Sequence, residues 1–160
     1  MTDEIVLRPV AVVRNEMREI IDDVFGGTVS RIELDGSRFG PEALVGLSEF
    51  SHVEVIFYMH GIVTGSVEMG ARHPRGRKDW PKVGIFAQRA KFRPNQIGAT
   101  VCRLRKVEGL ILEVENLDAI DGTPVLDIKP FLEEFGPRGE VRQPAWAKEL
   151  MAGYWAGSGQ

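Results

Sequence analysis

Short runs rich in β-branched and other apolar residues recur along this chain, and residues typical of turns separate them. The run that starts at Leu110 alternates strictly, with Leu110, Leu112 and Val114 on one side and Glu113 and Glu115 on the other. This period of two is typical of a half-buried strand. Many short strands with few helices favour a small β-barrel or a sandwich. We expect strands at residues 5–13, 28–34, 53–59, 83–87, 99–107 and 110–116.

One of these runs differs from the others. Residues 53–59 read VEVIFYM and are almost continuously apolar. A run of this kind predicts a central strand that is covered on both faces.

Helices are expected at two places, and both are short. Pro41 precedes the segment EALVGL, and a proline is favourable at the first position of a helix. Pro144 precedes a second segment, in which Trp146, Leu150 and Tyr154 recur every four residues. This spacing predicts an aromatic helix face that packs onto the barrel or onto a second subunit.

The composition indicates one domain in a reducing compartment. The chain has 160 residues, 43% of them hydrophobic, which suffices for one core, so we expect a single domain at 1–155 and a disordered tail at 156–160. The formal net charge of −3 predicts neither a nucleic-acid nor a membrane partner. Cys102 is the one cysteine and has no partner for an intrachain disulfide. Because no apolar run approaches the length of a membrane span, we expect a cytoplasmic protein.

Positive charge is concentrated in one segment, residues 72–93. Only one acid, Asp79, accompanies its arginines and lysines. The first part is rich in proline and glycine and is expected to form a loop whose cations contact phosphates. Trp80, Phe86 and Phe92 lie among the cations and can stack on an unpaired base. Composition supports equally well a solvated basic loop with Phe86 in the core.

Two further segments are expected to be rigid turns. FRPNQIG, residues 92–98, contains Pro94, Asn95 and Gly98. The second turn, DGTP at 121–124, precedes a strand that ends at Pro130. Rigid turns place backbone groups accurately, so either can bind a ligand. For the second turn, spacing alone favours a plain hairpin with a surface charge pair between Asp127 and Lys129.

Motifs for several other chemistries are missing from the sequence. It contains no glycine-rich dinucleotide motif, no P-loop, no HExxH motif and no paired cysteines. The three histidines are scattered singly, although His60 ends the apolar run and can face a pocket. We therefore expect no Rossmann cofactor site and no bound metal.

Three stretches resemble, in order and spacing, the TrmO family, whose members are also called TsaA-like or YaeB-like proteins. They are GLSEFSHVEVIFYMH at 46–60, RHPRGRKDWPKVGIFAQRAKFRPNQIG at 72–98 and DAIDGTPVLDIKPF at 118–131. The resemblance implies a β-barrel methyltransferase, usually a homodimer, that uses S-adenosylmethionine. It further implies N6-methylation of threonylcarbamoyladenosine next to the anticodon of tRNA. The ending WAKELMAGYW resembles that of a divergent short subgroup.

The resemblance also implies a set of site residues, although no catalytic residue is assigned. Arg89 is expected to pair with the carboxylate of the cofactor, while Asp121 and its turn hold the adenosine or the cationic methionine end. The family's proline-and-glutamine segment is replaced here by DDVFGG, and Gln96 replaces a proline. The expected cofactor residues are Gly26, Gly27, His60, Gly61, Arg89, Asp121, Gly122, Thr123 and Pro124. The expected acceptor residues are Arg75, Arg77, Lys78, Trp80, Arg93 and Asn95.

Two other functions remain open at this stage. One is a methyltransferase that acts on a different acceptor, and the other is a non-catalytic RNA-binding barrel. The binding module would use the basic segment and the aromatics but would have no use for His60 and the DGTP turn.

Overall fold

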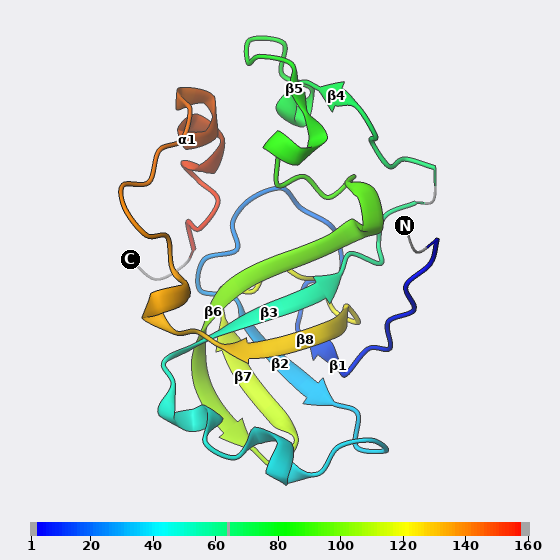
Figure 1. Cartoon of the computed structure of the whole chain (residues 1–160), viewed down its shortest axis with the longest axis vertical. Coiled ribbons are helices and arrows are strands. Elements are labelled where there is room, and N and C mark those ends of the chain that lie inside the picture. Colours follow the sequence, from blue (N-terminus) through cyan, green and yellow to red (C-terminus); the bar gives the residue numbers. More distant parts are fainter. Residues whose placement is uncertain (1–2, 64, 158–160) are drawn as a thin grey trace.

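The computed structural model describes residues 3–63 and 65–157 and contains a closed six-stranded barrel (Figure 1). Neighbouring strands are antiparallel around the whole barrel, in the order β1-β2-β7-β6-β3-β8. The predicted fold class, a mainly β protein with a small barrel, is therefore confirmed. The barrel strands are β1 (Ala11–Arg14), β2 (Val29–Leu34), β3 (His52–Tyr58), β6 (Ile97–Glu108), β7 (Ile111–Glu115) and β8 (Pro124–Pro130).

The core of the molecule is the inside of this barrel. Alternate residues on each strand point inward, as the period of two requires. Val13, Ile32, Val55, Leu112 and Val125 are fully buried there. Short aliphatic side chains of this kind fill the interior of a small barrel without leaving a channel.

The strand β3 corrects one expectation. Residues 53–59 were expected to be covered on both faces, but burial alternates: Val53, Val55 and Phe57 are buried, whereas Tyr58 is exposed. A closed barrel has a single inside, and the outer face of this strand is only partly covered.

Two other strand predictions were too long. The first strand begins at Ala11, and the preceding residues are extended and exposed, with Ile5 and Val6 exposed by 77% and 84%. The run at 83–87 forms the short strand β5 (Val83–Gly84), which pairs with β4 (Ala71–Arg72), and then a 3-10 helix, η4 (Ile85–Ala87). β-branched residues alone did not extend these strands, because no neighbouring strand is present to pair with them.

Helical segments lie at the two ends of the barrel. Two 3-10 helices, η1 (Pro41–Leu44) and η2 (Leu47–Glu49), lie at one end (Figure 1). The long connection from β3 to β6 and the helix α1 (Ala145–Met151) lie beyond the other end. That connection also contains η3 (Pro74–Gly76) and η5 (Pro94–Gln96), and η6 (Glu133–Phe135) follows β8. No helix in the described residues is long and apolar enough to cross a bilayer.

The C-terminal segment packs against its own chain. The predicted helix is shorter than expected, because α1 ends at Met151 and Tyr154 lies in the turn after it. The Tyr154 ring contacts the Phe25 ring of the loop between β1 and β2, with 5.1 Å between centroids. Of the tail expected to be disordered, residues 156 and 157 are described, and Gly157 lies against Gly26. Residues 158–160 lie outside the described part of the chain.

The barrel interior makes a stability prediction. Leu112→Ala should lower the free energy of unfolding by about 2–5 kcal/mol, because it removes a fully buried side chain that the neighbours cannot replace. Val101→Ala, on the outward face of β6 and 42% exposed, should change it by about 1 kcal/mol or less. Urea unfolding of both variants measures this, and equal losses would contradict the assignment of the core.

Candidate cofactor and acceptor site

Two of the predicted cofactor segments meet at one rim of the barrel. His60 is exposed in the turn after β3, and its Nε2 atom would lie 3.8 Å from a Cβ atom placed on Gly122. Next to it, the backbone of Gly61 lies against the side chains of Ile20 and Ile120. The structure thus brings the turn at 60–61 beside the turn at 120–122, although about 60 residues separate them in sequence.

The DGTP turn is held firmly by the strand β1 and the loop after it. The N–H of Gly122 donates to the Val13 carbonyl at 2.8 Å, and the Val13 N–H donates to the Thr123 carbonyl at 2.9 Å. Gly122 has a φ of +80°, which favours glycine. Pro124 begins β8. The turn is therefore rigid, as expected.

The carboxylate of Asp121 is already occupied by its own chain. Its Oδ1 accepts the Asn15 N–H at 3.1 Å, and its Oδ2 lies 2.5 Å from Arg18 Nη1. The side chain of Asp121 is 17% exposed. These contacts make Asp121 an anchor for the turn, with its charge balanced by Arg18.

Arg89 and a second carboxylate, Asp118, are each bound to the start of β6. Arg89 is exposed, and its Nη2 donates to the Ala99 carbonyl at 2.5 Å, at the start of β6. The next residue of that strand, Thr100, donates its hydroxyl to Asp118. The Tyr154 hydroxyl donates to the other oxygen of Asp118. The half-buried side chain of Asp118 thus links Thr100, at the barrel rim, to Tyr154 in the C-terminal segment.

The environment of Tyr154 is charged as well as buried. Burial raises the pKa of Tyr154 well above its usual range, and the negative charge of Asp118 adds to this effect. Arg89 and Arg75 lie near enough to lower the Tyr154 pKa in part. The hydroxyl therefore stays protonated and acts as a hydrogen-bond donor at ordinary pH.

Asp118, Thr100 and Tyr154 are not among the site residues predicted from the sequence. Asp118 lies three residues before the DGTP turn, but no spacing motif marks it as a site residue. Tyr154 appeared only as part of an aromatic helix face. No local signal links residues 36 positions apart.

Gly26 and the residues beside it pack against the backbone of the C-terminal segment at residues 154–157. The N–H of Phe25 donates to the Tyr154 carbonyl at 2.9 Å. A Cβ atom on Gly26 would overlap the backbone carbonyl of Trp155. Gly27, with a φ of +73°, donates its N–H to Asn116 Oδ1 at 2.8 Å. Glycine at 26 thus permits a close approach of two chain segments beside the Asp118 group.

Most cations of the basic segment have partners within the molecule. Arg75 forms a bidentate pair with Asp23 at 2.7 Å, Arg77 pairs with Asp79, and Lys91 lies 2.9 Å from Asp22. Arg93 donates to the Gln88 carbonyl at 2.6 Å, and Asn95 is exposed in a left-handed turn. Within the described residues, Lys78 and Lys82 are exposed and show no ion pair. The acids that pair with these cations mostly lie outside the segment, so the sequence overstated its free positive charge.

Trp80 does not lie where stacking on a base requires it. The residue is 5% exposed, and its Nε1–H donates to Glu149 Oε2 at 2.8 Å. The guanidinium of Arg77 covers one face of the ring at 3.9 Å from the centroid. Phe86, which the alternative prediction placed in the core, is 80% exposed. Phe86 is therefore exposed at this surface, whereas Trp80 joins the loop to α1 and the half-buried Phe92 ring is contacted by Arg72 and Lys91.

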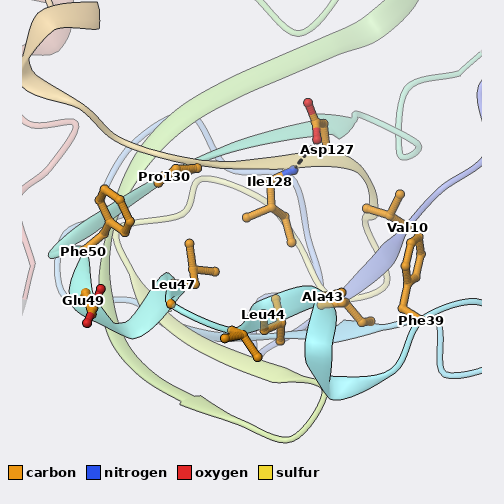
Figure 2. A pocket seen from close by; sticks show the side chains of 13 residues that line it. Val10, Phe39, Ala43, Leu44, Leu47, Glu49, Phe50, Asp127, Ile128 and Pro130 are labelled. Carbon is orange, nitrogen blue, oxygen red and sulfur yellow. Dashed lines mark hydrogen bonds between the residues drawn. The ribbon is translucent and has the colours of Figure 1, made fainter.

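A pocket of about 480 Å³ lies at the opposite end of the barrel (Figure 2). Figure 2 shows Leu47 and Ile128 pointing into it, between η1, η2 and β8. Its lining is largely apolar and contains none of the residues predicted to bind the cofactor or the acceptor. The pocket therefore offers few groups for a charged ligand. The described residues contain no group of three His, Cys, Asp or Glu side chains placed to hold a metal ion.

Fold and rim together define a small closed β-barrel with a charged, polar site at one end. A family model described as the tRNA-methyltransferase O N-terminal domain matches residues 23–136. This match covers more than half of the chain, so the chain belongs to that family, and the predicted resemblance is confirmed.

Individual relatives agree with this assignment. A human "tRNA (adenine(37)-N6)-methyltransferase" is 40% identical over 102 residues, which cover 64% of this chain but 23% of the relative. A "probable S-adenosyl-L-methionine-binding protein" from Methanothermobacter thermautotrophicus is 38% identical over 139 residues, covering 85% of this chain and 96% of the relative. A crystal structure of TrmO from Pseudomonas aeruginosa superposes with a TM-score of 0.70 at 31% identity, covering 89% of this chain and 61% of that one. The chain thus spans less than a quarter of the human relative it matches.

The close contact between Gly26 and Trp155 can be tested by substitution. Gly26→Ala should release the C-terminal segment, because the new methyl group overlaps the Trp155 backbone. Chymotrypsin should then cleave after Tyr154 or Trp155 faster than in the unchanged protein. Gly84→Ala is the control, since a Cβ atom there meets open space. A cleavage rate that is the same in both variants would contradict the contact.

Proposed function

We propose that this chain is an S-adenosylmethionine-dependent methyltransferase that methylates N6 of threonylcarbamoyladenosine beside the anticodon of tRNA. The observation that supports the proposal is the rim, where His60 lies beside the DGTP turn, at one end of a barrel of this family. Arg89 is held separately by the Ala99 carbonyl at the start of β6. The human relative carries the name of a tRNA adenine N6-methyltransferase, and the archaeal relative carries that of a probable cofactor-binding protein.

The residues of the rim suit such a cofactor. S-adenosylmethionine supplies an electrophilic methyl group on a positively charged sulfur. The adenosine needs a surface where the backbone is accessible, and Gly122, whose nearest neighbour is the His60 ring, provides a stretch without a side chain there. The exposed Arg89 offers donors to a carboxylate. The task of the protein is then to align the acceptor nitrogen behind the methyl carbon, which accelerates such displacements by proximity and orientation.

The surface near the rim suits a nucleic-acid acceptor that is contacted over a small area. Lys78 and Lys82 are exposed cations, and Phe86 is an exposed ring on which an unpaired base can stack. Asn95 extends this surface with a polar side chain. Arg75, Arg77 and Arg93 keep a role in acceptor binding if the ligand replaces their present partners.

A methyltransferase that acts on another acceptor is the second candidate. It is favoured by the internal pairing of Arg75, Arg77 and Lys91, which reduces the positive charge available for phosphates. A non-catalytic RNA-binding barrel has less support, because it gives no role to His60 and the DGTP turn at the rim.

We further propose that residues 1–155 act as one domain, that the protein works in the cytoplasm and that it is a homodimer. Trp155, 43% exposed, and Phe135, 85% exposed, are suitable anchors for an interface. Tyr154, an anchor by sequence, is engaged with Asp118 and Phe25 instead. One chain has a mass of 17.8 kDa, and light scattering at micromolar concentration should give twice this value. A monomeric mass would exclude the dimer.

The activity is tested on cellular tRNA. Cells that lack the gene should accumulate threonylcarbamoyladenosine without its N6-methyl group, and the purified protein should restore the group with S-adenosylmethionine. Mass spectrometry of tRNA nucleosides measures both. If the nucleoside is unchanged in these cells while the protein still binds the cofactor, the second candidate replaces the first.

The acceptor surface is tested by salt dependence. Replacing Lys78 and Lys82 together with alanine should weaken tRNA binding and reduce its salt slope by about two units, about one for each lost phosphate contact. Cofactor binding should stay unchanged. Replacing Lys106 and Arg105, in the β6–β7 hairpin, with alanine removes the same charge elsewhere and should leave the slope unaltered. Equal effects of both double variants on tRNA binding would show that only net charge matters.

A further inference from the structure

Two neighbouring acids in the loop between β1 and β2, Asp22 and Asp23, occupy two cations of the basic segment. Arg75 donates two hydrogen bonds to the Asp23 carboxylate, at 2.7 Å each, and a third to the Asp22 carbonyl at 3.0 Å. The ammonium group of Lys91 lies 2.9 Å from Asp22 Oδ1. The paired residues are 52 and 69 positions apart in sequence. These contacts therefore join the basic segment to a distant acidic loop.

The two acids present a charge pattern that resembles a stretch of nucleic-acid backbone. The hydrogen bond from Lys91 lowers the pKa of Asp22, and the charges of Arg75 and Arg72 lower it further, so this carboxylate stays ionised at neutral pH. Two successive carboxylates carry one negative charge each, as two successive phosphate groups do. Arginine and lysine bind both kinds of anion. The acids and the phosphates of an acceptor would thus compete for the same cations.

The backbone is strained on both sides of the pair between Arg75 and Asp23. Arg75 has a φ of +51°, and Val24, next to Asp23, has a φ of +71°. A left-handed backbone is unfavourable for a residue with a side chain, and most of all for a β-branched one such as valine. The paired side chains of Arg75 and Asp23 are also 26% and 35% exposed, and ion pairs that water reaches contribute little stability. The contact is therefore one that a competing anion can replace.

We propose that Asp22 and Asp23 form an intramolecular competitor, which occupies Arg75 and Lys91 in the free protein and is displaced when phosphates of an RNA acceptor bind these cations. The inference rests on the proposed function for the acceptor being RNA. An RNA that offers only phosphates has to overcome the acids with nothing in return. An acceptor whose unpaired base also binds at the rim gains enough to displace them. The acids thus lower affinity for every RNA and raise the preference for the acceptor.

The displacement involves the acidic loop and not the whole basic segment. Trp80 is buried and donates its Nε1–H to Glu149, which holds this part of the segment against α1. Pairing of β4 with β5 holds the segment at both sides of the Arg75 turn. Val24, by contrast, is 58% exposed. We therefore expect the loop around residues 22–24 to move away while the Arg75 turn stays in place.

The competition is tested first by removing the charge of both acids. The double variant Asp22→Asn with Asp23→Asn should bind an RNA hairpin of the anticodon arm about tenfold more tightly, because two cations are freed and two repelling charges are lost. Toward ~1 M salt, where the Debye length is about 3 Å, the gain should shrink. The control, Glu133→Gln with Glu134→Gln, removes the same charge from adjacent exposed acids of η6 and should change affinity by about twofold or less. Fluorescence anisotropy measures both.

Hydrogen–deuterium exchange of the unchanged protein provides a second test, which does not depend on how the variants fold. Addition of the RNA hairpin should speed exchange in peptides that span residues 18–27, because the acidic loop loses its partners, and slow it at residues 72–80. If the double variant binds RNA no more tightly than its control, or if residues 18–27 do not exchange faster, the acids are structural only and the inference fails while the proposed function stands. If the unchanged protein and both variants bind no RNA, the RNA acceptor of the proposed function fails as well.

Discussion

Closure of the barrel between β1 and β8 is the constraint on which the rest of the structure depends. These two strands pair over only two positions, Ala11 with Val125 and Val12 with Pro124. The DGTP turn extends this short seam through the hydrogen bonds between Val13 and the turn residues Gly122 and Thr123. The same turn that is proposed to hold the cofactor therefore closes the barrel, which explains its rigidity.

The fold was predictable because a barrel strand has a period of two, which local sequence records directly. The alternation of β7 was recognised for this reason, whereas the turns at Asn95 and Gly122 were recognised from their turn-forming residues. The end points of β1 and β5 were not, because a strand ends where its partner ends. That information is not local.

The site was predictable in its segments but not in its contacts. Family motifs pointed to His60, Arg89 and the DGTP turn, and the structure brings His60 beside Gly122. They gave no sign that Arg75 pairs with Asp23, 52 residues away. Ion pairs and buried aromatics depend on which distant segments meet, and this is why the free positive charge of the basic segment was overestimated and Trp80 was expected at the surface.

We propose that the cofactor binds at the polar rim and not in the apolar pocket at the other end of the barrel. Hydrogen–deuterium exchange with and without S-adenosylhomocysteine tests this directly, because bound ligand slows exchange of the amides it covers. We expect slower exchange in peptides that span residues 58–62 and 118–124, with residues 39–50 unchanged. Slower exchange at 39–50 with no change at the rim would contradict it.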